Sequence, residues 1–331
     1  MKIALDVMGG DNAPDSTIEG GLDALKECDD IFIYFVGPST KINEKLDEFG
    51  VDDIKDRFEV VEASEVITNE EKPVEAIRKK KDSSLVKAVS LVRDNEADTA
   101  VTAGSTGAFM AAGYFVLRRI KGIDRPALAP IFPSASGYTI VLDVGSNMDA
   151  KPEHLLQYAK MGSIYAKGVF KIEKPTVGLL NVGTEEGKGN ELTKKAYDLL
   201  KEADDINFKG NIEARDVPGG AVDVVVCDGF VGNVMLKFME GAASFIFGSL
   251  KKEITKSFSR KVGAVMLKSA FSDFAKQMDY TEHGGAPLLG VKGALIKSHG
   301  SSDAKAIKNA ILKQGKGLIE SKVLEQFNNT I

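Results

Sequence analysis

The chain has 331 residues, of which 43% are hydrophobic and 27% charged, and its formal net charge is −5. This composition is typical of a soluble globular protein with a large core, and the length alone leaves room for two domains. The acidic balance argues against general nucleic-acid binding, which usually shows as a basic excess.

Signals for export, membrane insertion and disulfides are weak in this sequence. Asp6 interrupts the first apolar run, which is too short and too polar for a signal peptide. No uncharged apolar run approaches the roughly 18 residues of a membrane span. Cys28 and Cys227 are far apart and have no CxxC partner, so they predict two buried thiols rather than a disulfide framework or a zinc site. We therefore expect a cytoplasmic protein.

Short apolar runs alternate with helical patterns along most of the chain. Strands are predicted at residues 2–8, 31–37, 57–63, 175–182 and 221–227, and helices at 15–27, within 63–97 and at 152–170. Residues 127–132 and 138–144 predict a hairpin, 286–298 two short strands around a glycine turn, and 301–327 a C-terminal amphipathic helix. The alternation favours an α/β fold with a mostly parallel sheet, to which the hairpin gives mixed character.

Residues 98–112, DTAVTAGSTGAFMAA, combine an apolar strand-like run, a loop of small residues and a helix start. Gly104 and Gly107 allow a sharp turn and a close approach to a ligand. The first N–H groups of the helix, with the hydroxyls of Ser105 and Thr106, would then bind an anion. The same pattern also fits an ordinary strand–helix turn with a serine N-cap.

Five other predicted strands end in similar glycine-containing loops. The loops begin as DVMGGDN at Asp6, DVGSN at Asp143, NVGT at Asn181, CDGFVGN at Cys227 and EHGG at Glu282. Because the carboxyl ends of parallel strands lie along one edge of a sheet, we expect these loops to meet at one crevice.

Two nucleotide-binding signatures are absent from the sequence. Residues 184–190, TEEGKGN, have the composition of a phosphate loop but not the spacing of the nucleotide P-loop, which argues against ATP or GTP binding. No GxGxxG motif occurs, so the usual dinucleotide fingerprint is also missing. The basic cluster at residues 78–81 fits either a solvated helix face or a clamp for an anionic substrate or partner.

Residues 234–277 predict a long helical stretch, which we expect to protrude as an arm at about 234–278. Phe247, Leu250, Ile254 and Phe258 recur at helical spacing on one side. Residues 251–268 hold six basic residues and one acidic residue, against the acidic balance of the whole chain. Such a stripe fits a core or dimer contact, and its basic flank also fits a membrane surface or an acidic protein.

The expected crevice suits a reaction in which the substrate itself is the nucleophile. Its lining is rich in glycine, aspartate and asparagine, whereas the chain has three histidines and no recognisable nucleophile motif. Inorganic phosphate fits because its dianion, present near neutral pH, can attack an acyl carbonyl directly. The protein would hold the phosphate, orient the carbonyl and stabilise the oxyanion with N–H donors or a lysine. We expect neither a cofactor nor a metal ion.

Six segments occur in order over nearly the whole chain: MKIALDVMGGDNAP, TAGSTGA, LDVGSN, LLNVGTEEGKGN, VCDGFVGNV and YTEHGGAPLLGVKG. Together they closely resemble the phosphate acyltransferase family of bacterial phospholipid synthesis, which makes acyl phosphate from acyl-[acyl-carrier-protein]. The resemblance implies a single three-layer α/β/α domain over residues 1–331, related to isocitrate and isopropylmalate dehydrogenases and to phosphotransacetylases. It also implies a homodimer that transfers a long-chain acyl group from the carrier's pantetheine thioester to phosphate.

The resemblance further implies loose association with the inner face of the membrane, where the acyl phosphate passes to a glycerol-phosphate acyltransferase. The arm then has two candidate roles, contact with lipid and contact with the acidic acyl carrier protein. Its predicted contact residues are Phe247, Leu250, Lys251, Lys252, Ile254, Lys256 and Phe258.

In this light, Gly104, Ser105 and Thr106 are predicted to bind phosphate or the carbonyl oxygen, and Lys188 to stabilise charge near the thioester. His283 either protonates the departing thiolate or orders the glycine turn that follows it. The remaining predicted polar lining consists of Asp6, Gly9, Asn12, Asn147, Asn181, Gly183, Asp228, Gly229 and Asn233, and Asn233 is also a candidate catalytic residue.

Two other classes of function stay open. A dehydrogenase of related architecture would bind a nicotinamide cofactor and a divalent metal, with Asp6, Asp143 and Asp228 as magnesium ligands, although these acids are scattered one to a loop. A non-catalytic carrier-protein or membrane scaffold would explain the basic arm but not the row of glycine loops.

Overall fold

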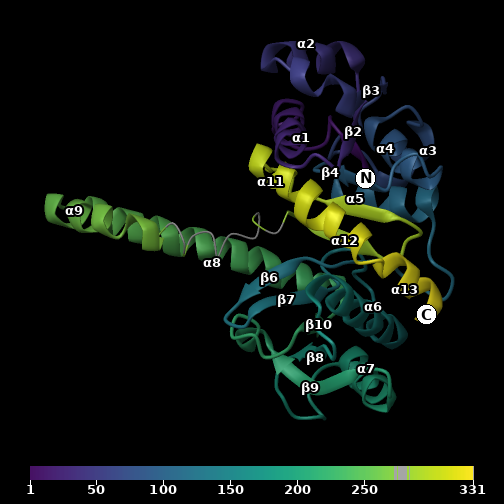
Figure 1. Cartoon of the computed structure of the whole chain (residues 1–331). Helices are drawn as coiled ribbons and strands as arrows, with labels where there is room; N and C mark the ends of the chain where they lie inside the picture. The colour runs from purple at the N-terminus through teal and green to yellow at the C-terminus, as the bar shows by residue number, and fades with distance from the viewer. Residues whose placement is uncertain (272–273, 275–281, 283, 331) are drawn as a thin grey trace.

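The computed structural model describes residues 1–271, 274, 282 and 284–330, and within them the strands form two sheets (Figure 1). The seven-stranded sheet has the order β3-β2-β1-β4-β12-β11-β5, and the five-stranded sheet has the order β6-β7-β10-β8-β9. The first sheet contains β1 (Lys2–Asp6), β2 (Phe32–Gly37), β3 (Phe58–Glu62), β4 (Thr99–Thr102), β5 (Ala127–Leu128), β11 (Ala286–Leu289) and β12 (Ala294–Lys297). The second contains β6 (Ile131–Ser134), β7 (Gly137–Leu142), β8 (Thr176–Asn181), β9 (Asn207–Glu213) and β10 (Val224–Val226).

Most strand pairs in both sheets are parallel. The exceptions are the pairs of β11 with β12 and β5, and the hairpin of β6 and β7. The predicted α/β fold with mostly parallel strands is therefore confirmed, and its strands divide between two sheets.

Helices cover both faces of the first sheet because its side chains alternate between two apolar clusters. Ile3 and Leu5 of β1 pack on the side of α1 (Asp15–Glu27), whereas Ala4 packs on the side of α4 (Ser84–Arg93). The first face also carries α11 (Ala304–Asn309) and η5 (Ala310–Gly315), and the second carries α5 (Thr106–Ala112) and η2 (Gly113–Leu117). Other helices around this sheet are α2 (Ser39–Phe49), η1 (Asp52–Arg57) and α3 (Pro73–Lys79).

The second sheet lies between α6 (Pro152–Phe170) and the first turns of α8 (Gly229–Thr255). Tyr158 of α6 belongs to the cluster that covers one face, and Met235 of α8 belongs to the cluster on the other. The same α6 packs toward the C-terminal helices, where the buried Tyr165 hydroxyl donates to Gln314 Oε1 at 2.7 Å. One apolar core therefore includes residues of both sheets. The helices α7 (Glu191–Glu202), η3 (Ala214–Asp216), α12 (Lys316–Glu320) and α13 (Val323–Thr330) complete this body.

Two predicted elements are divided in the structure. The strand expected at 127–132 splits around Pro130, which has no N–H for a ladder, so β5 joins the first sheet and β6 the second. The helix expected at 301–327 begins only at Ala304, after the cap Asp303, and is interrupted at Lys322, whose φ is +55°. The helices at 15–27 and 152–170 have the predicted bounds.

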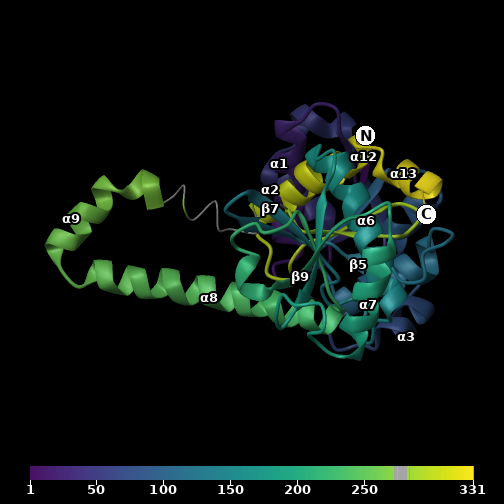
Figure 2. The same ribbon diagram turned by 90° about the horizontal axis from the view of Figure 1, so that it is seen from below.

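The helical arm extends away from the two-sheet body (Figures 1 and 2). It consists of the outer part of α8 and of α9 (Phe258–Met266). The prediction that Phe258 continues the stripe of Phe247, Leu250 and Ile254 along one helix is wrong, because α8 ends at Thr255 and Phe258 begins α9. By length and composition alone, α8 is apolar enough to cross a membrane, but its first turn is packed into the second sheet.

Candidate functional site

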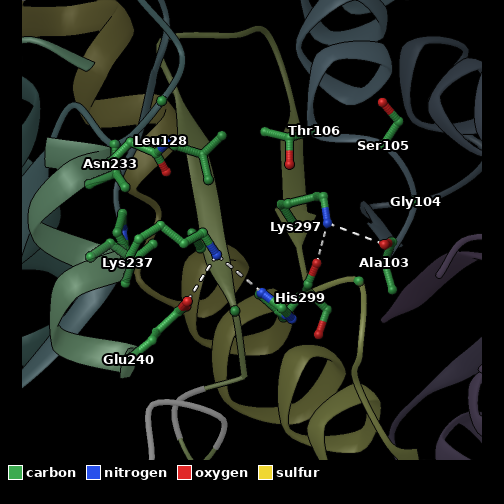
Figure 3. Close-up of a pocket in the computed structure, with 18 of the residues that line it drawn as sticks. Ala103, Gly104, Ser105, Thr106, Leu128, Asn233, Lys237, Glu240, Lys297 and His299 are labelled. Atoms are coloured by element: carbon green, nitrogen blue, oxygen red, sulfur yellow. Dashed lines mark hydrogen bonds and ion pairs between the residues drawn. The ribbon is translucent and has the colours of Figure 1, made fainter. Parts of the chain in front are cut away.

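A cavity of about 460 Å³ lies between the two sheets (Figure 3). Loops and strand ends from the first sheet form one side of it. The β5–β6 connection, the loop after β7 and the first turns of α8 form the other side. The lining residues are Asn69, Ala103, Gly104, Ser105, Thr106, Leu128, Pro130, Ile131, Val144, Gly145, Met148, Asn233, Leu236, Lys237, Glu240, Gly285, Ala286, Lys297, Ser298, His299 and Gly300.

The polar side of the cavity is built on the ends of three adjacent parallel strands. Asp6, Thr102 and Lys297 are the last residues of β1, β4 and β12. The Thr102 hydroxyl donates to Asp6 Oδ2 at 2.6 Å and accepts from the Gly104 N–H at 2.9 Å. This chain of hydrogen bonds fixes the loop that begins at Gly104. Burial raises the pKa of Asp6, and the nearby charge of Lys297 opposes that shift.

Lys297 is a buried cation at this end of the cavity. Its residue is only 7% exposed, and its Nζ donates to Ala103 O at 3.3 Å and to Ser298 O (Figure 3). Burial lowers the pKa of Lys297 to about 8, although Asp6 and Asp11 favour its charged form. Sequence reasoning missed this residue. The signal was present, since Lys297 ends an apolar strand and is followed by Ser-His-Gly and a capped helix, like the other loops.

Charged side chains at the cavity connect the base of the arm to the β12–α11 loop. Lys237 Nζ of α8 lies 2.9 Å from Glu240 Oε2 and 3.4 Å from His299 Nε2 (Figure 3). The other ring nitrogen of His299 lies 2.8 Å from Ser301 Oγ. Burial and the Lys237 charge lower the pKa of His299, so the ring is held mainly neutral near pH 7. Sequence reasoning missed these three residues as well.

The opposite wall of the cavity is apolar. Its side chains come from the β5–β6 connection, the loop after β7 and α8, and they are Leu128, Pro130, Ile131, Val144, Met148 and Leu236. One cavity therefore joins a buried ammonium to a hydrocarbon-like surface.

Four of the predicted site residues line this cavity: Gly104, Ser105, Thr106 and Asn233. Ser105 also caps α5 by accepting from the Ala108 N–H at 3.5 Å, as the ordinary-turn interpretation predicted. Gly107 has a packing role, because a Cβ there would lie 2.5 Å from Pro73 Cγ.

Three further predicted site residues lie directly behind the polar side of the cavity, and they are Asp6, Gly9 and Asn12. A Cβ on Gly9 would lie 2.7 Å from Asp6 Oδ2 and from the Gly104 N, so Gly9 permits this close approach. Asn12 Nδ2 donates to Ser301 O at 3.2 Å and thereby joins the β1–α1 loop to the loop after β12.

Asn147, Asp228 and Gly229 organise the loops of the second sheet beside the cavity. Buried Asp143 accepts from the Asn147 N–H at 2.6 Å and from the Leu128 N–H at 3.1 Å. The Gly229 N–H donates to Asn147 O at 2.9 Å, and Asp228 Oδ1 caps α8 by accepting from the Val231 N–H at 2.9 Å.

The alternative of a magnesium site has no support in the part of the chain that the structure describes, where no group of three or more His, Cys, Asp or Glu residues lies together. Asp6 ends a strand of the first sheet, whereas Asp143 and Asp228 follow strands of the second. Backbone N–H groups donate to both carboxylate oxygens of Asp143 and to Oδ1 of Asp228.

The loop after β8 carries Asn181, Gly183 and Lys188. Asn181 Nδ2 donates to Lys188 O at 3.1 Å, and Lys188 Nζ lies 3.9 Å from Glu185 Oε1, with the Lys188 side chain half exposed. Within the described ranges, this loop contributes no residue to the cavity lining, so the crevice contains fewer loops than the sequence predicted.

His283 lies outside the described residues, whereas Gly285 lines the cavity. The basic cluster at residues 78–81 spans the end of α3 and the two residues after it. Lys80 pairs with Glu71 at 2.8 Å, and the Arg78 guanidinium stacks 5.3 Å from the Phe115 ring centre.

Comparison with known proteins identifies the family. A sequence profile described as "Fatty acid synthesis protein" matches residues 1–326. A protein named phosphate acyltransferase in Alkaliphilus oremlandii is 52% identical over 331 residues, which are 100% of this chain and 97% of the relative. A phosphate acyltransferase of Brevibacillus brevis is 56% identical over 313 residues, which are 94% of this chain and 92% of the relative.

Solved structures show the same fold at low sequence identity. The EutD phosphotransacetylase of Staphylococcus aureus has a TM-score of 0.61 at 16% identity, and the match covers 96% of this chain and 94% of the EutD chain. A 4-hydroxythreonine-4-phosphate dehydrogenase of Klebsiella pneumoniae has a TM-score of 0.50 at 10% identity, and the match covers 96% of this chain and 97% of the dehydrogenase chain. The predicted likeness to phosphotransacetylases and to a dehydrogenase fold is confirmed. On the strength of the full-length relatives, the chain belongs to the phosphate acyltransferase family and is an acyltransferase.

Proposed function

We propose that this protein forms acyl phosphate by transferring an acyl group from the thioester of an acyl carrier protein to inorganic phosphate. The observation that carries the proposal is the single cavity that joins the buried Lys297 ammonium to an apolar wall. The family gives the reaction class, and the cavity has the two surfaces that a phosphate and an acyl chain require.

In the proposed reaction a phosphate oxygen attacks the thioester carbonyl carbon. A carbon–oxygen bond forms, the carbon–sulfur bond breaks, and the electron pair leaves with the carrier's thiolate, which takes a proton from solvent or a protein group. Gly104, Ser105 and Thr106 line the cavity, and the hydroxyls of Ser105 and Thr106 are suited to donate to the phosphate or the carbonyl oxygen. Holding both reactants in one cavity supplies the proximity that a bimolecular attack needs.

The acyl chain is proposed to lie on the apolar wall formed by Leu128, Ile131, Val144, Met148 and Leu236. Each buried methylene group contributes about 0.8 kcal/mol to binding, so a long acyl chain that covers this wall binds more tightly than an acetyl group would. Met148 is 49% exposed at the edge of the wall, where a longer chain would pass toward solvent.

We further propose that the arm receives the acidic carrier protein and rests on the anionic membrane surface. Its outer part combines exposed apolar side chains with basic residues. The proposed contact residues are Phe247, Leu250, Lys251, Lys252, Ile254, Lys256 and Phe258. A cytoplasmic homodimer, loosely held at the membrane beside the glycerol-phosphate acyltransferase that takes the product, completes the proposal.

The reaction is tested by incubating the purified protein with phosphate and a long-chain acyl carrier thioester and trapping acyl phosphate with hydroxylamine. Hydroxamate is expected only when protein, phosphate and thioester are all present. Release of free carrier thiol should match hydroxamate formed. Thiol release without dependence on phosphate would instead show a thioesterase and contradict the proposal.

A further inference from the structure

We propose that Lys297 is the cation that holds the attacking phosphate in the cavity. This inference rests on the function proposed above and assigns the phosphate end of the site to the residue that ends β12.

The position of Lys297 fits an anion bound at the polar end of the cavity. The residue ends the strand next to β4, and its register partner is Thr102, which fixes the Gly104 loop. Its Nζ donates to Ala103 O, just after β4, and to Ser298 O, just after β12, so the ammonium bridges the adjacent ends of these two strands (Figure 3).

The charge of Lys297 is incompletely compensated. Two of its three N–H groups donate to carbonyl oxygens, and among the residues that the structure describes no carboxylate oxygen lies within ion-pair distance of its Nζ. A buried ammonium is costly unless an anion or several acceptors neutralise it. An anionic ligand at the cavity would supply this missing partner, and phosphate is the small anion of the proposed reaction.

Two other lysines are poorer candidates for this role. Lys237 also lines the cavity, but it is 53% exposed and its Nζ already pairs with Glu240 at 2.9 Å. Lys188 lies on the loop after β8, pairs with Glu185 and is half exposed. Water screens both of these charges more than it screens the buried Lys297.

The burial of Lys297 predicts that kcat/KM for phosphate is high only over a narrow pH range. The charged and titratable groups that act on Lys297 are Asp6 of β1, Asp11 of the following loop, Lys237 of α8 and the neighbouring His299. Because burial dominates, the pKa of Lys297 in the free protein is about 8. The value of kcat/KM for phosphate should therefore rise as phosphate becomes a dianion near neutrality and fall as pH passes about 8, where Lys297 loses its proton.

The test compares Lys297→Met, Lys297→Arg and the control Lys195→Met, which removes an exposed lysine of α7 paired with Glu191. Phosphate KM and kcat are measured by the hydroxamate assay, and phosphate binding is measured separately by ³¹P NMR line broadening. Thermal unfolding checks that each variant is folded. Lys297→Met should raise the phosphate KM about 10- to 100-fold, the range for a lost charge-assisted hydrogen bond, with a smaller change in the KM for the acyl carrier. The control should match the wild type.

Lys297→Arg separates a role in phosphate binding from a purely structural role of the lysine. Since a guanidinium stays protonated, this variant should recover part of the phosphate binding and lose the alkaline fall near pH 8. A folded Lys297→Met protein with unchanged phosphate KM, phosphate binding and pH profile would overturn the inference. If the wild type binds phosphate but forms no hydroxamate, the proposed reaction fails, whereas loss of phosphate binding in Lys297→Met still supports the role of Lys297.

Discussion

The sequence context of Lys188 and Lys297 differs from their burial in the structure. Lys188 stands in a glycine-rich motif that drew attention in the sequence, yet in the structure its side chain is half exposed. Lys297 ends an ordinary apolar strand, yet it is almost completely buried in the cavity. Motif composition singled out the first, whereas burial and contact distances single out the second.

Lys188→Ala is still predicted to lower acyl phosphate formation by about 100-fold, the size of effect that follows loss of one oxyanion donor. The Lys188–Glu185 pair is exposed and 3.9 Å long, so it contributes little and the ammonium can exchange its partner for the thioester end of the substrate. Hydroxamate formation measures the effect, and Lys195→Ala on the neighbouring helix is the control. Wild-type kcat and KM in Lys188→Ala would remove this residue from the site.

The candidate site could be predicted from the sequence where glycines mark strand ends. Gly104, Ser105, Thr106 and Asn233 were found in this way and line the cavity. Lys237, Lys297 and His299 were missed because a charged residue at a strand end or on a helix usually faces solvent, and only the tertiary fold buries Lys297 and brings the other two to the same cavity.

At the scale of elements, α8 connects the cavity to the arm. Asp228 caps its start, Asn233, Leu236, Lys237 and Glu240 of its first turns line the cavity, and its outer half belongs to the arm (Figure 2). Gly232 lets the helix approach β7 closely, because a Cβ at this position would lie 2.0 Å from Asp143 O. A side chain there would have to push the helix base away from the second sheet.

Gly232→Ala is therefore predicted to destabilise the protein by about 1–3 kcal/mol, the usual cost of overpacking, and to lower activity by displacing Asn233. Gly248→Ala on the same helix is the matched control, since a Cβ there meets nothing within 4 Å. That substitution should stabilise α8 by about 0.5–1 kcal/mol because alanine has the higher helix propensity. Urea unfolding measures both changes, and equal stability of the two variants would contradict the packing argument.

The elements were largely predictable because each has a local signal. The helix at 152–170 has proline in its first turn, and α1 shows amphipathic spacing. Pro130 marks a possible break in 127–132, but nothing in that short run says that Leu128 pairs with Leu288 in one sheet while Ile131 belongs to the other. Strand pairing between distant segments is decided by tertiary packing.

At the scale of the whole molecule, two sheets with their own helices place the cavity where loops from both meet. The sequence predicted one edge lined by all the glycine loops, whereas the fold brings the loops of β4, β7 and β12 and the start of α8 together and leaves the loop after β8 outside the cavity lining of the described residues. The arm adds a surface away from this cavity (Figure 1). The proposed chemistry and the proposed docking surface thus lie on different parts of the molecule.

The outer arm is predicted to bind anionic lipid through apolar residues flanked by positive charge. Val265 and Met266 of α9 are 73% and 81% exposed, and Arg260 and Lys261 precede them on the same helix. The protein should sediment with vesicles that contain anionic phospholipid, and less so in high salt, because salt screens the basic residues while apolar insertion adds affinity.

The double substitution Val265→Asp and Met266→Asp should abolish this sedimentation, since two carboxylates would be both desolvated and repelled at the lipid surface. The kcat at saturating acyl carrier thioester should persist, because neither residue lines the cavity. Val74→Asp, which adds a charge at an exposed apolar position of α3 on the body, is the control and should sediment like the wild type. If the double variant still sediments fully, Val265 and Met266 do not hold the arm on lipid, and these exposed side chains are then expected to contact the carrier protein or a second copy of the chain. A mass that rises with protein concentration in analytical ultracentrifugation would then indicate a second copy of the chain, because self-association requires no carrier protein.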